Sequence, residues 1–178
     1  MSRGKAGKQR KFKGVAKDPL DLRDLMYEGS LRELPFKFDK RSSVPIILDQ
    51  GEEGACTGFG LAAVVNFLLF NRASAKPSEK QRLTKLESSA SPRMLYEMAK
   101  RYDEWKGENY EGSSIRGAMK GWLRHGVCTW GDWPYSTENR GRLTPDRQLK
   151  ALSRPLGNYL RVRHLHLNQM HSALNEHR

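Results

Sequence analysis

The fold of this chain is decided by the stretch Val44-Pro-Ile-Ile-Leu-Asp-Gln50-Gly-Glu-Glu-Gly-Ala-Cys56-Thr-Gly-Phe-Gly-Leu-Ala-Ala-Val-Val-Asn-Phe-Leu-Leu-Phe70. It begins with a β-branched run, passes through a glycine-rich turn and ends in a predicted helix over about 57–72 that is apolar on nearly all sides. A helix with so little polar surface belongs at the centre of a domain. We therefore expect its residues to be core, with the exception of the cysteine at its start.

Cys56 stands where the turn becomes the helix, with Gln50 six positions upstream. The positive end of a helix dipole stabilises a thiolate, which is the nucleophilic form of cysteine. The amide of Gln50 is the kind of N–H donor that, beside a backbone N–H, stabilises a tetrahedral oxyanion. Together these residues indicate acyl transfer, most simply the hydrolysis of peptide bonds. The alternative reading is that Cys56 is an inert buried thiol.

The residues around Cys56 resemble the local signature of the papain-like (C1 family) cysteine peptidases. That signature is C-G-[SA]-C-[WY], and in the family Gln-Gly precedes it. Gln50-Gly51 stands at the matching offset, and residues 53–57 fill the pentapeptide as Glu-Gly-Ala-Cys-Thr. Two positions depart from the signature. Glu53 stands where family members often have a disulfide-forming cysteine, and Thr57 replaces an aromatic residue.

Later segments resemble the same family in the same order. Tyr110-Glu-Gly112-Ser-Ser leads into a predicted helix, as a glycine-rich substrate-binding loop does in the family, and Trp133-Pro-Tyr135 is similar to a Tyr-Pro-Tyr-like turn. The resemblance covers roughly residues 36–135 and is closest to the cysteine-poor bacterial branch. It implies an α+β protein with the papain-like cysteine proteinase fold, present mainly as its helical left lobe, with a central buried helix that starts at the nucleophile.

The resemblance also assigns roles to individual residues. Cys56 is implied to be the catalytic nucleophile, and Gln50 the oxyanion donor beside the Cys56 backbone N–H. Gly112 and Ser113 are implied to bind the backbone of an extended peptide or protein substrate, although Ser113 replaces one glycine of the family's pair. No cofactor and no metal are expected.

The histidine and asparagine of the family's active site are not found. They lie about 130–150 residues after the cysteine, which from Cys56 is about position 186 or later. The sequence ends at Arg178 and contains no Gly-His-Ala-like or Asn-Ser-Trp-Gly-like segment. We therefore expect a nucleophile-bearing lobe that is truncated before the C-terminal His/Asn lobe, is inactive alone, and has that lobe as a partner in cis or in trans.

The five histidines match no motif of the family. His125 precedes Gly126 at the end of a predicted helix, where a cation favours the helix dipole. The others lie within the last fifteen residues and lack cysteine or carboxylate companions at metal-ligand spacing, so we expect surface or interlobe positions for His164, His166, His171 and His177.

The net charge of +12 belongs to the two ends of the chain. Residues 1–17 hold seven Lys/Arg and no acid, residues 140–178 hold eight against two acids, and residues 18–139 are nearly neutral. We divide the chain into a disordered basic tail (1–17), an extended lead-in (18–43) and a papain-like peptidase domain that is incomplete at its C-terminus (44–178). Nucleic acid is not favoured as a partner, because no aromatic platform or groove-reading helix accompanies the basic tail.

Cys56 and Cys128 are the two cysteines, which is not a disulfide framework. We expect both to be free thiols, with Cys128 packed as a small hydrophobe, and a reducing compartment, the cytoplasm being favoured. No signal-peptide pattern is present. The longest apolar run, over 59–70, is shorter than the ~18 residues that span a bilayer, so no membrane is expected.

Other elements follow from local signals. Ser91-Pro92 predicts the start of a helix, and a second helix is predicted from about 114 to 125, closed by Gly126. Alternating apolar residues predict strand-like segments at 36–39, 44–48 and 159–165. A last helix is predicted from 167, with Asn168 as its cap.

The first functional reading is therefore a papain-like cysteine peptidase that acts through Cys56. A second reading is a noncatalytic, degenerate peptidase lobe that binds peptides or proteins. A third is a basic nucleic-acid-associated protein, supported only by the charged ends.

Overall fold

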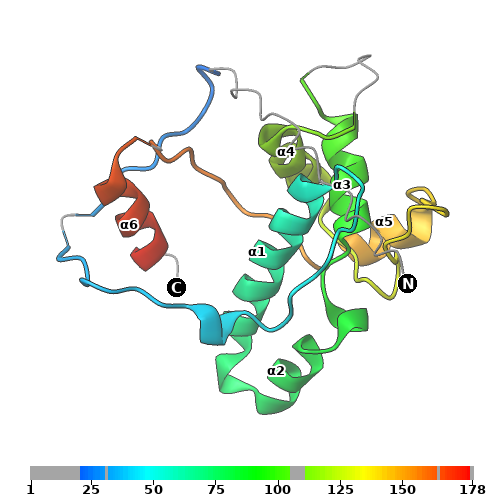
Figure 1. Ribbon diagram of the computed structural model, residues 1–178, viewed down its shortest axis with the longest axis horizontal. Coiled ribbons are helices and arrows are strands. Elements are labelled where there is room, and N and C mark those ends of the chain that lie inside the picture. Colours follow the sequence, from blue (N-terminus) through cyan, green and yellow to red (C-terminus); the bar gives the residue numbers. More distant parts are fainter. Residues whose placement is uncertain (1–20, 31, 105–110, 164, 177–178) are drawn as a thin grey trace, which may run out of the picture.

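The regular elements in the described part of the chain are helices, which are joined by long irregular segments (Figure 1). This computed structural model describes residues 21–30, 32–104, 111–163 and 165–176. The predicted tail (1–17), His164 and His177 lie outside these ranges. The α-helices are α1 (Cys56–Arg72), α2 (Pro77–Leu83), α3 (Pro92–Arg101), α4 (Ile115–His125), α5 (Pro145–Ala151) and α6 (Leu167–Glu176), and the 3-10 helices are η1 (Arg41–Ser43), η2 (Ala73–Ala75) and η3 (Leu86–Ser88).

Helix α3 is the centre of the packing, because it contacts both α1 and α4. Glycines let the helices approach closely. A Cβ atom on Gly58 of α1 would lie 2.5 Å from the carbonyl oxygen of Pro92, and one on Gly121 of α4 would lie 2.7 Å from the Cβ of Met98. Distances under 3 Å are closer than packed carbon and oxygen atoms approach, so side chains at these positions would push α3 away from its neighbours.

The main core lies between α1, α3 and the segment after α4. Its buried members are Ala62, Val65, Ala90, Leu95, Trp122 and Val127. A buried polar contact crosses this core, since the backbone N–H of Ala90 donates to Oδ1 of Asn66 over 2.8 Å. This bond satisfies a backbone donor that the core would otherwise leave unpaired.

The local signals at the start of α3 and at both ends of α4 are confirmed, and the one for the last helix is not. Ser91 caps α3 by accepting from the N–H of Met94, with Pro92 in the first turn. Ser114 caps α4 by accepting from the N–H of Gly117. Gly126 follows α4 with φ of 70°, a conformation that favours glycine. The last predicted helix is also present, but it begins at Leu167, so Asn168 lies inside it and is not its cap.

The expectation that every apolar residue of α1 is core is wrong for its outward face. Val64 is 47% exposed, whereas Val65 is 2% exposed. The reason is that α3 and α4 cover one side of α1 only. On the other side, Val64 lines an apolar groove together with Ala63, Phe67 and parts of 37–44.

The β part of the predicted α+β class is not found among the described residues. They contain two isolated bridges, Met26 with Arg161 in parallel and Ala90 with Thr129 in antiparallel orientation. Residues 36–39 and 44–48 alternate in sequence but form no strand, because a strand needs a partner whose N–H and C=O groups pair with its own. Within the same described ranges, no helix combines the length and apolarity required to cross a bilayer.

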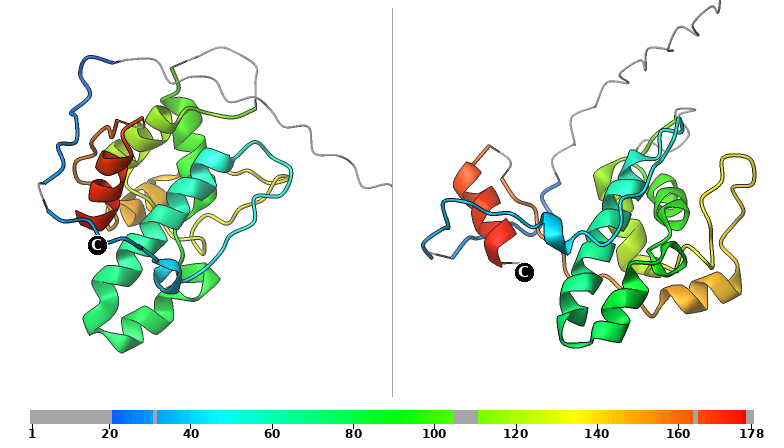
Figure 2. Two further views of the ribbon diagram at one scale, coloured as in Figure 1. Left: turned by 60° about the vertical axis from the view of Figure 1, so that its left-hand side comes forward. Right: turned by 60° about the horizontal axis from the view of Figure 1, so that its bottom comes forward.

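Helix α6 and the lead-in lie side by side, apart from α3 (Figures 1 and 2). The hydroxyl of Tyr27 contacts Oγ of Ser172 at 3.0 Å and Oε2 of Glu176 at 2.6 Å. Asp24 then connects this pair of segments to the helical body, through ion pairs with Arg116 of α4 and with Arg161.

Two glycines of α1 provide a test of the α1–α3 packing. A Gly58→Ala change should lower the free energy of unfolding by about 1–3 kcal/mol, because the added methyl group meets the backbone of α3. Gly60→Ala is the matched control, since no atom lies within 4 Å of a Cβ there, and it should raise stability by up to about 1 kcal/mol through helix propensity. Urea unfolding measures both. Equal midpoints for the two variants would contradict the close packing of α1 on α3.

Candidate functional site

Cys56 is the first residue of α1, and its side chain is exposed. The expected position at a helix start is therefore confirmed. Ala55 precedes the helix and provides no side-chain cap, so the first backbone N–H groups of α1 are directed toward the region before the helix. A thiol at this place is open to reagents and close to the positive end of the helix dipole.

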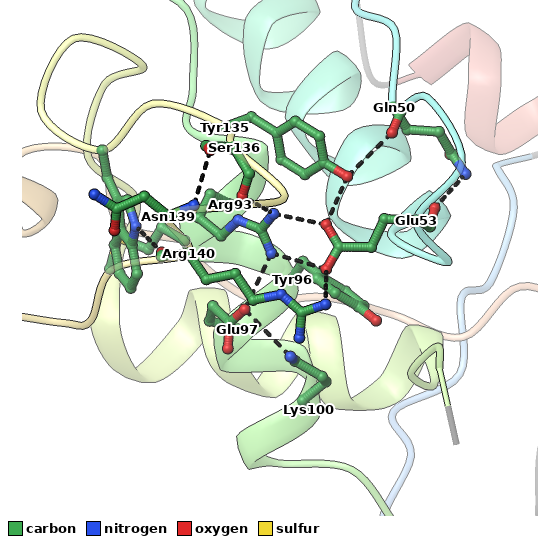
Figure 3. Close-up of polar contacts among 12 residues, drawn as sticks. Gln50, Glu53, Arg93, Tyr96, Glu97, Lys100, Tyr135, Ser136, Asn139 and Arg140 are labelled. Carbon is green, nitrogen blue, oxygen red and sulfur yellow. Dashed lines mark hydrogen bonds and ion pairs between the residues drawn. The ribbon is translucent and has the colours of Figure 1, made fainter. Parts of the chain in front are cut away.

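Gln50 lies on the turn before α1 and is half-buried. Its side-chain Nε2 donates to the backbone carbonyl of Glu53 over 3.1 Å, and its own backbone carbonyl accepts from the hydroxyl of Tyr135 over 3.0 Å. A primary amide carries two N–H donors, so the first contact uses one of the two. The turn is thus closed by its own side chain and held from outside by Tyr135 (Figure 3).

Glu53, which stands where the resemblance implied a cysteine, forms a buried ion pair with Arg93 of α3 (Figure 3). Arg93 Nη2 lies 2.6 Å from Oε2 and Nη1 lies 3.1 Å from Oε1 of the carboxylate. The two side chains are 0% and 4% exposed, respectively. Arg93 also reaches Glu97 of its own helix at 3.2 Å. The turn before Cys56 is therefore fixed to α3 by charge.

The segment after Trp133 completes this cluster. The hydroxyl of Tyr135 donates to Oε2 of Glu53 over 2.7 Å, and Arg93 Nη2 donates to the carbonyl of Ser136 over 2.6 Å. The Tyr135 ring stacks edge-on against Phe59 of α1, with centroids 4.7 Å apart. The acid, the arginine and the tyrosine therefore join three segments that are distant in the sequence.

The cluster affects the proton affinity of its members. Burial acts to raise the pKa of Glu53, but hydrogen bonds from Arg93 and Tyr135 and the nearby positive charges outweigh it and lower the pKa. Burial and the neighbouring Glu53 carboxylate raise the pKa of Tyr135. Glu53 is therefore a carboxylate and Tyr135 a neutral hydroxyl donor at neutral pH.

The loop that contains Gly112 and Ser113 borders the start of α1. Ser113 Oγ lies 2.5 Å from Oγ1 of Thr57, and the N–H of Gly112 donates to the hydroxyl of Tyr96 over 3.1 Å. Gly112 has φ of 131°, a conformation that favours glycine. All four sequence-predicted site residues are thus found at or next to the N-terminus of α1. The two residues that depart from the family pattern here, Thr57 and Ser113, contact each other.

The described histidines lie elsewhere. His125, in the last turn of α4, is 2.7 Å from the hydroxyl of Tyr102 and 2.8 Å from Oε1 of Gln148. His166 and His171 are exposed, before and within α6. None of these three forms a hydrogen bond with Cys56. In the described part of the chain, no group of three or more His, Cys, Asp or Glu residues is placed to hold a metal ion.

Sequence reasoning missed the Glu53–Arg93–Tyr135 cluster. Glu53 stood out only as a mismatch to the family signature, and Arg93 was not singled out. The available signal was this arginine, because an arginine among residues destined for a core requires a buried partner.

Comparison with known proteins shows a shared fold. No family model matches the sequence, and no curated protein matches it. A similar solved structure is xylellain, a cysteine protease from Xylella fastidiosa, with a TM-score of 0.63 and 20% sequence identity. The match covers 88% of this chain and 60% of the xylellain chain. At this identity the likeness shows the fold alone: the helices described above are arranged as in part of a cysteine protease.

The two thiols should differ in reactivity. Cys128 is 1% exposed, and burial raises its pKa to about 11, so about 0.1% of it is thiolate at pH 8. Iodoacetamide should therefore modify exposed Cys56 first, which peptide mass spectrometry can follow. The control is labelling in urea, where both thiols should react alike. Equal labelling of both thiols in the folded protein would contradict the assignment.

The buried ion pair should be costly to break from one side. Glu53→Gln leaves the Arg93 guanidinium buried with less compensating charge, and we expect a loss of about 3–5 kcal/mol in the free energy of unfolding. The neighbouring Glu52 is exposed, so Glu52→Gln should change stability by no more than about 0.5 kcal/mol. Urea unfolding of the two variants compares them, and matching midpoints would show that the pair does not hold the turn.

Proposed function

We propose that this chain is the nucleophile-bearing part of a papain-like cysteine peptidase. The observation that carries the proposal is the exposed Cys56 thiol at the first position of α1, beside the Gln50 turn, in a fold shared with a cysteine protease. A thiol that were only a packing element would be buried, as Cys128 is.

In the proposed reaction, the Cys56 thiolate attacks the carbonyl carbon of a peptide bond, and the carbonyl oxygen becomes an oxyanion. The Gln50 amide and the Cys56 backbone N–H donate hydrogen bonds to this oxyanion. Collapse of the tetrahedral species breaks the C–N bond, and the leaving amine takes a proton from a general acid. Water then hydrolyses the thioester, which returns the thiol.

Gly112 and Ser113 are proposed to bind the substrate backbone. Their loop borders the start of α1 through the Ser113–Thr57 contact, so an extended peptide that pairs with it would pass close to Cys56. The N–H of Gly112 is engaged with Tyr96, and its carbonyl is the group that would accept from a substrate N–H.

The general base is proposed to be a histidine outside the described residues of this chain, on a complementary lobe in cis or in trans. Two observations support a partner of this kind. The chain spans 60% of the xylellain structure, and α1 has an apolar face that lines a groove of about 690 Å³ with Val44 and Leu174. A complementary lobe that packs here would cover Val64 and Phe67.

One observation favours a noncatalytic peptide-binding lobe as a second candidate. His125 is hydrogen-bonded to Tyr102 and Gln148, none of the three described histidines forms a hydrogen bond with Cys56, and a thiol without a base turns over poorly. The same loop and turn would then bind a peptide without cleaving it, and Cys56→Ala would leave that binding unchanged.

Turnover separates these candidates. The 178-residue chain alone should cleave a fluorogenic peptide at least about 10²–10⁴-fold more slowly than a complete site, because general acid–base help is missing. Fusion to the part of xylellain that has no counterpart here should raise turnover, and Cys56→Ala in the fusion should abolish it. Cys128→Ala is the matched control and should retain activity. Fast turnover by the unfused chain would refute the need for a second lobe. If the fusion protein kept its turnover after the Cys56→Ala change, Cys56 would be excluded as the nucleophile.

A further inference from the structure

The turn between Gln50 and Cys56 is held at its midpoint. Glu53 lies three residues after Gln50 and three before Cys56. Its carboxylate accepts hydrogen bonds from Arg93 of α3 and from the Tyr135 hydroxyl in the segment after Trp133. It also forms an ion pair with Arg140 at 3.4 Å. A side chain that is fixed this way restrains the backbone of the turn between Gln50 and Cys56.

The Tyr135 hydroxyl has a second contact on the same turn. It lies 2.7 Å from Oε2 of Glu53 and 3.0 Å from the carbonyl oxygen of Gln50. A phenol carries one proton, so this proton is shared between a carboxylate and a peptide carbonyl. This shared hydrogen bond fixes the distance between Glu53, in the middle of the turn, and Gln50, which carries the amide donor.

The cluster has little access to water. Arg93 is 0% exposed and Glu53 is 4% exposed, and charged hydrogen bonds are stronger where water is excluded. The Tyr135 ring also packs against Phe59 and against the Arg93 guanidinium. The Cζ atom of Arg93 lies 4.4 Å from the centroid of the Tyr135 ring. The hydroxyl is therefore directed by a ring that cannot rotate freely.

We propose that Glu53 and Tyr135 are positioning residues for the Cys56 site. They fix the position of Gln50 relative to Cys56, so that the side-chain amide and the thiol face the same carbonyl group of a substrate. This positioning needs no disulfide bond beside the nucleophile. This inference rests on the proposed function, and it predicts that the tyrosine hydroxyl affects the placement of a carbonyl group but not the exposure of the thiol.

The test compares two alkylating reagents on the folded 178-residue chain, with modification of Cys56 followed by mass spectrometry. Iodoacetamide needs only an exposed thiol. A peptidyl chloromethyl ketone must also place its carbonyl near Gln50 before the thiolate displaces chloride and forms the C–S bond. The ratio of the two rate constants therefore reports positioning. Tyr135→Phe removes the hydroxyl and keeps the ring.

Tyr135→Phe should lower the ratio about five- to tenfold, the rate equivalent of one hydrogen bond, and leave the iodoacetamide rate unchanged. Gln50→Ala should lower the ratio by on the order of 10². Tyr27→Phe is the matched control, because that hydroxyl also contacts a carboxylate, Glu176, at 2.6 Å but lies near α6. It should leave the ratio unchanged.

The failures of the two proposals are distinguishable. If Gln50→Ala lowers the ratio and Tyr135→Phe does not, the positioning role is overturned and the proposed function stands. An equal drop for Tyr27→Phe and Tyr135→Phe would mean general destabilisation and would also overturn the positioning role. If Gln50→Ala has no effect, the proposed oxyanion donor is wrong, and the positioning proposal is overturned with it.

Discussion

The buried ion pair between Glu53 and Arg93 is the constraint on which the site geometry depends. Arg93 is fully buried near the start of α3, and α3 is the helix that contacts both α1 and α4. The turn that delivers Cys56 to α1 is therefore attached to the most central element of the fold. Because an unpaired buried charge costs several kcal/mol, the turn and the helix are constrained to fold into one arrangement.

The residues that depart from the papain-like pattern form contacts of their own. Glu53, where the resemblance implied a cysteine, pairs with Arg93. Thr57 and Ser113, where it implied an aromatic residue and a glycine, contact each other. Each departure is thus accommodated by a local partner. An ionic link also differs from a disulfide in a physical respect: it forms in a reducing environment, and it needs no oxidant to close.

Local signals in the sequence predicted the helix ends well. Ser91, Ser114 and Gly126 act through contacts within a few residues, so their effect could be read from the sequence. The exposure of Val64 could not be read from the sequence, because burial of a helix face depends on which elements pack against it. The strand predictions for residues 36–39 and 44–48 were wrong for the same reason, since a strand requires a partner. In the site, the positions of Cys56 and Gln50 followed from spacing, whereas the contact of Tyr135 with Glu53 joins residues 82 positions apart.

The association of α6 with the lead-in has a consequence for the order of folding. Tyr27 and Ser172 are 145 residues apart in the chain, and the entropic cost of closing a loop grows with its length. Helices α1, α3 and α4 are separated by far fewer residues along the chain, so we expect them to pack against one another first. On a ribosome, Asp24 of the lead-in can therefore pair with Arg116 as soon as α4 has emerged, whereas Tyr27 gains its Ser172 partner only after α6 has emerged.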